Sequence, residues 1–371
     1  MRTGLPDFAV RHTSEPLAAS VVTAAAAAAS FGDVFTEHMV VVDHDLKRGW
    51  HDARVLPLGP IELHPTTIGL HYGQSVFEGL KAYRRRDGGI AVFRPLANAA
   101  RFRASARRLM MPELPDELFL ASIEHLVRQD HRWVPDEPGR SLYLRPLLIA
   151  TERVLALRPA REYRYLLTAF PMGTYFGGMA RPVTVWVSHE FSRAAAGGTG
   201  AAKCAGNYAA GLAAQAQAAE MGCDQVVWLD AAERRFVEEL GGMNLFFVVG
   251  AGRAARLVTP RLTGTILPGL IRDSVLRLAQ DLGLTTEERA VTLDEWRRGA
   301  ASGAVTETFA CGTAAAVTPV GAARASDGEW TIGDGTEGPV TRRLRTLLGD
   351  VQHGDAPDRH GWMHEIVAPA A

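Results

Sequence analysis

The spacing of apolar and polar positions along the chain predicts alternating strands and helices. Helical periodicity in the first half covers Leu96–Met110 and Glu117–Asp130. Shorter apolar runs at Phe35–Val42 and Ile90–Phe93 are typical of strands. No apolar stretch reaches the ~18 uninterrupted residues that a membrane-spanning helix needs. The pattern therefore predicts a globular protein without a membrane segment.

The second half continues the mixture of strands and helices. Its expected strands are short apolar runs bounded by turn residues: Val183–Val187, Gln225–Leu229, Phe236–Glu239 and Asn244–Val249. Its expected helices show the helical apolar period: Tyr208–Met221, Leu270–Leu282 and Val340–Gly349. Because strands and helices occur in both halves, we expect the fold class to be α+β.

A change of composition near the middle of the chain predicts a domain boundary. Glycine and proline recur between Ala169 and Pro182, as is typical of a linker. The length of 371 residues also favours two domains, at about 150 residues for each. We predict a small N-terminal α/β domain at residues 1–174, an interdomain linker at 175–182 and a large C-terminal domain at 183–371.

Composition narrows the class of partner. The formal net charge of −1 gives no electrostatic attraction to nucleic acid or to an anionic membrane, so small molecules are the expected partners. The three cysteines, Cys204, Cys223 and Cys311, form no CxxC pair, which argues against a metal site or a disulfide framework. They suit a reducing cytoplasm. The alanine-rich segment Leu17–Ser30 is a poor secretory signal because acidic residues precede it.

Lysine is rare in this chain. Only positions 47, 81 and 203 carry it, among 40 lysines and arginines. Arginine cannot form an imine, so a lysine retained in such a chain is a candidate for amine chemistry. Lys203 follows Gly197–Ala202, a run of small residues that lets the backbone approach a ligand closely. An apolar surround favours the neutral amine that attacks an aldehyde. A solvated lysine in a flexible loop is the alternative for this segment taken alone.

The run Gly198–Lys203 also resembles an incomplete GxGxxG in which lysine replaces the third glycine. A dinucleotide site would need a strand that ends at the first glycine and a helix that begins directly afterwards, but here more loop intervenes. An oxidoreductase with a nicotinamide cofactor is therefore disfavoured.

Two polar features downstream suit a pyridoxal ring. Tyr208 could donate a hydrogen bond to the phenolic oxygen of such a ring. Glu238 and Glu239 are adjacent on an expected strand, so one can face solvent while the other faces the site. A buried carboxylate beside the pyridine nitrogen would keep that nitrogen protonated and preserve the ring as an electron sink. Adjacent glutamates in a short strand are otherwise usually solvated.

Two loops are candidate phosphate sites. Thr263–Gly269 leads directly into the helix expected from Leu270, and the amides of Leu270 and Ile271 form the type of N-terminus that binds phosphate. The turn at Cys311–Ala315 adds the Thr313 hydroxyl and tight-turn amides. An amine, a phenol, a carboxylate and phosphate donors together match pyridoxal 5'-phosphate.

Seven ordered motifs cover most of the chain, from about Phe31 to beyond Val320. They are Leu70-His71-Tyr72, Phe77-Glu78-Gly79, Phe93-Arg94-Pro95, Ser141-Leu142-Tyr143-Leu144-Arg145-Pro146, Gly206-Asn207-Tyr208, Glu239-Leu240-Gly241-Gly242-Met243-Asn244 and Ile266-Leu267-Pro268-Gly269. In these motifs the chain closely resembles the branched-chain amino acid aminotransferases, which are pyridoxal phosphate enzymes of fold type IV. The resemblance implies a two-domain fold like that of D-amino acid aminotransferase, with the active site at the domain interface.

The resemblance also implies a role for each matching residue. Lys203 would be the Schiff-base lysine, and Glu239, rather than Glu238, would be the partner of the pyridine nitrogen. The other cofactor contacts would be Arg101, Tyr208, Leu270, Ile271 and Thr313. No metal ion is implied.

The substrate contacts follow from the same resemblance. The groups that would hold the substrate carboxylate are Tyr72, Ala314 and Ala315, and Arg145 would meet the distal carboxylate of glutamate or 2-oxoglutarate. An apolar pocket for the Val, Leu or Ile side chain would be lined by Phe77, Tyr143, Tyr175 and either Phe31 or Phe35. Leu157 matches a loop that reaches into the partner subunit's site, which implies a homodimer.

The implied reaction is transamination between L-leucine, L-isoleucine or L-valine and 2-oxoglutarate, giving branched 2-oxo acids and L-glutamate by a ping-pong mechanism. D-Amino acid aminotransferases and aminodeoxychorismate lyases are alternatives, but they are usually shorter and lack the Tyr143 to Arg145 pattern. A pyridoxal phosphate carrier without turnover would not need the substrate contacts. Two departures from the family pattern are Ala315-Ala316-Val317-Thr318, where some relatives have a CxxC pair, and Gly242, where many have threonine. Neither departure removes a cofactor contact.

Overall fold

The computed structural model describes residues 7–173 and 181–369. Contacts between Cα atoms divide the chain into two compact units. Unit 1 comprises Met1–Gly177, Ala202–Ala205 and Asp350–Ala371, and unit 2 comprises Gly178–Ala201 and Gly206–Gly349. The sequence pattern did not indicate that the short segment around Lys203 and the C-terminal residues join unit 1. Most of the predicted linker at 175–182 lies outside the described residues.

Within the described residues, unit 1 is built on a nine-stranded sheet in the order β1-β3-β2-β8-β7-β5-β6-β18, with β4 paired to β7. The strands are β1 Ala9–Val10, β2 His38–Asp45, β3 Gly49–Pro57, β4 Ser75–Phe77, β5 Leu80–Arg84, β6 Ile90–Phe93, β7 Ser141–Ala150, β8 Glu162–Met172 and β18 Met363–Val367. Long antiparallel pairings such as β7 with β8 bury one face of the sheet under helices.

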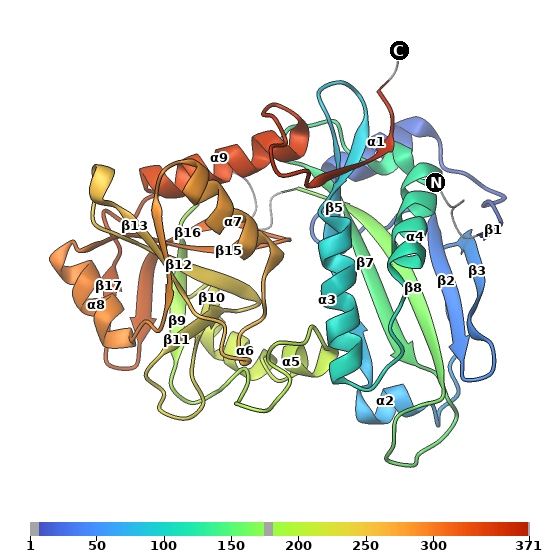
Figure 1. Cartoon of the computed structure of the whole chain (residues 1–371), viewed down its shortest axis with the longest axis horizontal. Helices are drawn as coiled ribbons and strands as arrows, with labels where there is room; N and C mark the ends of the chain where they lie inside the picture. Colours follow the sequence, from blue (N-terminus) through green and yellow to red (C-terminus); the bar gives the residue numbers. More distant parts are fainter. Residues whose placement is uncertain (1–6, 174–180, 370–371) are drawn as a thin grey trace. The chain divides into compact units, whose positions relative to one another are not determined.

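Two helices, α3 (Pro95–Arg108) and α4 (Asp116–Gln129), lie across that face of the sheet in Figure 1. Phe102 on α3 and Phe119 on α4 are fully buried in the same core as Tyr165 on β8. The remaining helices of unit 1 are α1 Ala19–Ala28, α2 Ile68–Tyr72 and the 3-10 turn His131–Trp133. The alanine-rich N-terminal segment therefore forms a short helix.

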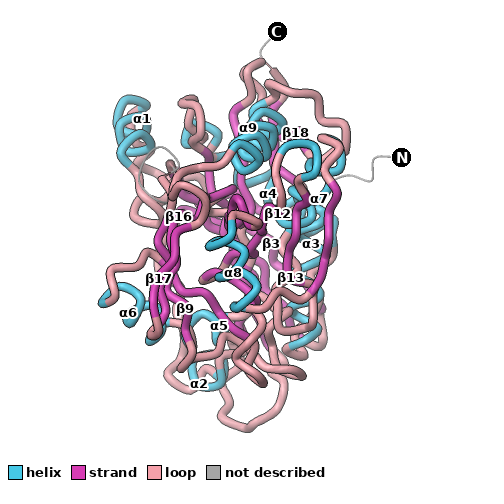
Figure 2. The backbone as a smooth tube through the Cα atoms, turned by 90° about the vertical axis from the view of Figure 1, so that its left-hand side faces the viewer, coloured by secondary structure: helices cyan, strands magenta, loops and turns pink. Residues whose placement is uncertain are grey.

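The sheet of unit 2 closes on itself. Its order is β11-β10-β9-β16-β15-β12-β13-β14, and β11 also pairs with β12, so that six strands form a ring. The strands are β9 Val183–Ser188, β10 Gln225–Leu229, β11 Val237–Leu240, β12 Met243–Val249, β13 Arg256–Pro260, β14 Thr285–Arg289, β15 Val305–Gly312, β16 Ala316–Ala325 and β17 Gly328–Thr331. Figure 2 shows β9, β16 and β17 running side by side.

The helices of unit 2 pack against this sheet. They are α5 Ala205–Ala209, α6 Leu212–Glu220, α7 Leu270–Asp281, α8 Leu293–Ser302 and α9 Pro339–His353, with a 3-10 turn at Gly252–Ala254; α5 begins and α9 ends in residues assigned to unit 1. The single helix expected at Tyr208–Met221 is wrong, because the chain breaks at Gly211, where an added Cβ would lie 3.4 Å from the Trp228 ring. Tyr208 therefore lies in a separate short helix. No helix of the described residues is long and apolar enough to cross a membrane.

Candidate functional site

The backbone of Lys203 is held by unit 1. Its carbonyl accepts a hydrogen bond from the Phe77 amide at 3.0 Å, and its own amide donates to the Ser105 hydroxyl at 2.9 Å. The neighbouring residues Ala202 and Cys204 are buried in the core, whereas Lys203 is half-buried. The small residues before the lysine thus allow the segment to pack against β4 and α3.

Lys203 and Arg145 contact the same aromatic ring. The Lys203 Nζ lies 4.8 Å from the centre of the Phe77 ring, and the Arg145 guanidinium carbon lies 4.9 Å from it. Both distances are in the range of a cation–π interaction. The structure therefore brings together three of the residues that the sequence assigns to the site.

Aromatic side chains continue from this point along the sheet. The Tyr143 ring lies 5.3 Å from the Arg145 guanidinium carbon and stacks on Phe170 at 4.9 Å. Phe31 contacts both of these rings edge-on, at 5.2 and 5.1 Å, while Phe35 reaches only Phe170. A cation among aromatic faces can accommodate either a carboxylate or an aliphatic group. Tyr175, also predicted for this pocket, lies outside the described residues.

Arg101 is oriented by a buried carboxylate. Its Nε donates to Glu78 Oε1 at 2.7 Å and its NH2 donates to Glu78 Oε2 at 2.8 Å, while Asn98 donates to the same Oε2. Burial alone would raise the pKa of Glu78, but the charge and hydrogen bonds of Arg101 hold it below its usual value. Arg101 shares one face of α3 with Ser105, the residue that binds the Lys203 amide.

Tyr72 and Leu157 lie in a different cleft of unit 1. Both line a cavity of about 390 Å³ near α2, and the Tyr72 hydroxyl donates to the Leu155 carbonyl at 3.0 Å. Leu157 is 86% exposed, an unusual state for a large apolar side chain. The described contacts thus group Tyr72 with Leu157 and not with Arg145.

In unit 2, Glu239 lies at the centre of a polar cluster. Its Oε1 accepts hydrogen bonds from the Leu267 amide and from the Asn244 side chain, both at 3.1 Å, and its Oε2 pairs with Arg193. Asn244 also donates to the Leu267 carbonyl at 3.0 Å. Glu239 is therefore linked to the loop that leads to α7.

Helix α7 begins at Leu270, as the sequence predicts, so the amides of Leu270 and Ile271 lie in its first turn. First-turn amides point outward from the helix and attract anions. Gly269 before the helix is required by packing, since a Cβ there would collide with the Asn244 side chain. The loop and the glutamate cluster are consequently packed directly together.

Tyr208 and the Thr313 turn complete this group. A Cβ placed on Gly242 would lie 3.4 Å from the Tyr208 ring, so the glycine that replaces the family's threonine leaves a close contact intact. Thr313, Ala314 and Ala315 form the half-buried turn between β15 and β16, and Ala316 after them has a φ of 52°. Left-handed backbone at a non-glycine residue is costly and is often found at ligand sites.

Glu238 differs from its expected state. The exposed fractions of Glu238 and Glu239 are 7% and 2%, so the expectation that one carboxylate faces solvent is wrong. Glu238 points to the opposite face of β11, accepts a hydrogen bond from the Thr265 hydroxyl and lines a cavity of about 480 Å³. Burial in the cavity wall shields the carboxylate from water, which explains why the pKa of Glu238 is raised in spite of that hydrogen bond.

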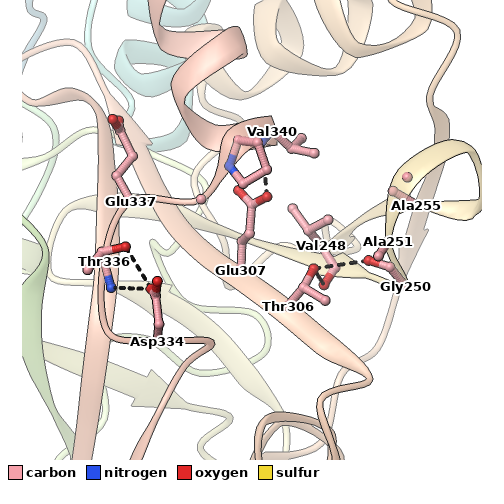
Figure 3. A pocket seen from close by; sticks show the side chains of 13 residues that line it. Val248, Gly250, Ala251, Ala255, Thr306, Glu307, Asp334, Thr336, Glu337 and Val340 are labelled. Atoms are coloured by element: carbon pink, nitrogen blue, oxygen red, sulfur yellow. Dashed lines mark hydrogen bonds between the residues drawn. The ribbon is translucent and has the colours of Figure 1, made fainter.

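The other polar cavity of unit 2 is structural in character. Figure 3 shows Glu307 within a cavity of about 360 Å³. Its carboxylate accepts from the Val340 and Thr341 amides at 3.0 and 2.8 Å, which caps the first turn of α9. Asp334 in the same cavity is engaged by Thr336. The described residues contain no group of histidine, cysteine and acidic side chains that could hold a metal ion.

The other two lysines are set apart by burial. Lys47 is exposed between β2 and β3, whereas Lys81 is buried on β5, opposite Tyr143 of β7. Burial lowers the pKa of Lys81 to about 8. All three cysteines are buried and free.

Comparisons with known proteins agree with this set of residues. The family model described as amino-transferase class IV matches residues 75–323. A branched-chain-amino-acid aminotransferase of Mycolicibacterium smegmatis is 57% identical over 99% of this chain and 100% of its own length. The crystal structure of the Escherichia coli branched-chain amino acid aminotransferase has a TM-score of 0.75 at 26% identity, covering 89% of this chain and 99% of that one.

A third comparison bears on the cofactor. The branched-chain amino acid aminotransferase of the organism abbreviated T.th., complexed with N-(5'-phosphopyridoxyl)-L-glutamate, has a TM-score of 0.72 at 30% identity, covering 89% of this chain and 99% of that chain. The fold and the comparisons define a class IV aminotransferase, an enzyme class that uses pyridoxal phosphate. Within that class, the chain belongs to the branched-chain amino acid aminotransferases.

Sequence reasoning missed the partners of the predicted residues. Glu78 lies inside a motif that the sequence already identifies, and its position beside a glycine in an apolar stretch was a signal of burial. Arg193 had no such signal, because its neighbours fit any loop. Phe170 was hidden in an ordinary strand pattern, so only the fold reveals that it stacks on Tyr143.

Proposed function

We propose that this chain transfers amino groups between L-leucine, L-isoleucine or L-valine and 2-oxoglutarate, giving branched 2-oxo acids and L-glutamate. The observation that carries the proposal is the shared contact of Lys203 and Arg145 with Phe77. It sets an amine suited to carbonyl chemistry within one aromatic contact of a cation suited to a carboxylate. A branched-chain aminotransferase needs both groups, because its pocket must accept an acidic and an apolar side chain in turn.

The residues present fit pyridoxal phosphate by the chemistry of their donors. Lys203 supplies the amine, Glu239 the buried carboxylate for the pyridine nitrogen, and Tyr208 the hydroxyl for the phenolic oxygen. The proposed phosphate donors are Arg101, Thr313 and the amides of Leu270 and Ile271. When bound, the cofactor supplies an aldehyde that captures the substrate amino group and a ring that accepts electrons from the substrate Cα.

The chain's own residues move the proton. Once the substrate amine has taken its place on the cofactor, the Lys203 Nζ is released and takes the proton from the substrate Cα. The same amine returns that proton to the C4' carbon, and water then releases the 2-oxo acid. Glu239 remains ionised throughout and keeps the pyridine nitrogen protonated. The second substrate, 2-oxoglutarate, reverses these steps and leaves as glutamate.

The pocket distinguishes its two substrates by charge and shape. Arg145 binds the distal carboxylate of the acidic substrate, while the faces of Phe77, Tyr143 and one of Phe31 or Phe35 contact the branched side chain. Tyr175 is proposed for the same wall. Tyr72 and the Ala314–Ala315 turn hold the carboxylate next to the reacting carbon.

We further infer a cytoplasmic homodimer. The exposure of Leu157, together with its place beside Tyr72, supports a loop that reaches into the partner subunit's site. Burial of a large apolar side chain against a second copy would remove its contact with water. Tyr72 then acts from the same loop cluster. Three free, buried cysteines suit a reducing compartment.

Visible absorption spectroscopy tests the function. The wild-type protein with pyridoxal phosphate should show a cofactor band that L-leucine bleaches and 2-oxoglutarate restores. Lys203→Ala should show no such cycle, while Lys47→Ala, which removes an exposed lysine, should behave as wild type. A wild-type band that leucine leaves unchanged would favour a D-amino acid or lyase activity. No band in excess cofactor would refute the assignment of Lys203.

A further inference from the structure

Arg193 connects three parts of unit 2 through one side chain. It follows β9, and its side chain is 9% exposed. Its Nε pairs with the Glu239 carboxylate, its NH2 donates to the Gly200 carbonyl at 2.9 Å and its NH1 donates to the Thr265 carbonyl at 3.2 Å. A planar guanidinium presents these donors in a fixed fork, which lysine cannot reproduce.

Each of these partners leads to a residue that we assign to the cofactor. Gly200 lies shortly before Lys203, and Thr265 lies in the loop before the first turn of α7. The two segments touch so closely that a Cβ on Gly200 would lie 2.6 Å from the Thr265 Cα. Arg193 therefore binds both segments at their point of contact, and its remaining donor faces Glu239.

We propose that Arg193 is a positioning residue that holds Glu239 ionised and in register with the loops before Lys203 and α7. This inference rests on the proposed function, because it takes Glu239 as the partner of the pyridine nitrogen. A guanidinium beside a buried carboxylate favours the ionised form, and an ionised carboxylate favours a protonated ring nitrogen. Arg193 acts through Glu239 and does not touch the reacting atoms.

The test compares two arginine variants of the full chain. Arg193→Met removes the charge and the fork, whereas Arg234→Met is a matched control, since Arg234 donates to the carbonyls of Phe191 and Glu190 and binds no carboxylate in the described contacts. Two quantities are measured: the dissociation constant of pyridoxal phosphate, and the ¹⁵N NMR shift of the pyridine nitrogen in labelled cofactor. Circular dichroism of the apoproteins checks folding.

Arg193→Met should weaken cofactor binding roughly thirtyfold or more, the loss typical of removing one partner of a buried charge pair. Its pyridine nitrogen signal should move toward the unprotonated value. Arg234→Met should keep the wild-type signal and bind within about twofold of wild type, as for a change remote from the charge pair. In a Glu239→Gln background, the further loss from Arg193→Met should be much smaller.

Arg193→Lys keeps the proposal testable if the methionine variant does not fold. The ammonium should retain the protonated nitrogen signal, while the lost fork should still weaken cofactor binding. Equal affinity and equal nitrogen signals in Arg193→Met and Arg234→Met would overturn the inference and leave the proposed function in place. Failure of the wild type to bind pyridoxal phosphate would overturn both.

Discussion

Unit 1 and unit 2 each bury an arginine–glutamate pair, but the functional member differs. In unit 1, Glu78 is fully buried and fixes Arg101, the residue proposed to bind phosphate. In unit 2, Arg193 is the support and Glu239 is the residue proposed to meet the cofactor. The same two side chains can therefore present either a cation or an anion to a ligand, depending on which one is held from behind by the fold.

The comparison teaches why such pairs tolerate burial. A lone buried charge is very costly, and a pair is acceptable only when further hydrogen bonds satisfy its remaining atoms. Glu78 is satisfied by Asn98 and by the Gly79 amide in addition to Arg101. Glu239 is satisfied by Asn244 and Leu267. In both units the supporting donors come from local backbone and amide groups, which carry no net charge.

The largest expected effect separates the two glutamates by their kinetics. Glu239→Gln should lower kcat of the cofactor-saturated enzyme on the order of a thousandfold, because a neutral amide no longer stabilises the protonated ring nitrogen. Glu78→Gln should leave that kcat within a small factor of wild type and instead raise the cofactor concentration needed for saturation. Steady-state rates at several pyridoxal phosphate concentrations measure both. Equal kcat losses would contradict the division of roles.

The next effect concerns folding. Glu78→Gln leaves the Arg101 guanidinium buried without its carboxylate, and removing one partner of a buried pair costs about 3–5 kcal/mol. Urea unfolding of the apoprotein should show this decrease in the free energy of unfolding. A change below about 1 kcal/mol, the range of exposed pairs, would mean that Arg101 finds other partners or turns to water.

The pH dependence of stability should differ in sign between Glu78 and Glu238. The pKa of Glu78 is lowered on folding, so its contribution is present above the ordinary value of 4.5 and is lost as pH falls through the lowered pKa. The pKa of Glu238 is raised, so the folded state is favoured at low pH, and this preference is lost as pH rises from 4.5 through the raised pKa.

Unfolding profiles of wild type, Glu78→Gln and Glu238→Gln from about pH 3 to pH 8 test these signs. The deficit of Glu78→Gln against wild type should grow as pH increases from the acidic end. Glu238→Gln should gain on wild type over the same increase, because glutamine keeps the hydrogen bond to Thr265 without a charge to bury. Parallel profiles for all three proteins would contradict the pKa directions.

The smallest effect is expected at an exposed pair. Arg256 and Glu287 approach to 2.9 Å on neighbouring strands β13 and β14, and the Arg256 side chain is 50% exposed. Arg256→Ala should change the free energy of unfolding by about 0–1 kcal/mol, since solvent screens the pair. A loss comparable to that of Glu78→Gln would show that burial is not what separates strong from weak pairs here.

Much of the fold was readable from periodicity and turn residues. The strands Ile90–Phe93 and Gln225–Leu229 occur as predicted, and α3, α4 and α7 begin or end within a few residues of the expected positions. The helix expected at Tyr208–Met221 failed because apolar alanines keep a helical period through Gly211, while the packing on Trp228 that breaks the helix is not visible locally.

The candidate site was readable only in part, for a physical reason. Lys203 is marked by its small neighbours, and Leu270 by the loop before it, so local composition indicated both. Arg193 and Asn244 act through partners distant in the sequence, and one sequence contains no record of which arginine meets which carboxylate. Glu238 was misjudged because strand alternation gives the face of a side chain but not what covers that face.

The C-terminal strand has a consequence for how the protein is made. β18 pairs with β6, so the sheet of unit 1 includes residues from both ends of the polypeptide. During synthesis, β6 remains an open sheet edge until the ribosome has produced nearly the whole chain, whereas unit 2 has almost all of its strands earlier. Vectorial synthesis thus favours late completion of unit 1, with an exposed edge that a chaperone or a neighbouring nascent chain can meet first.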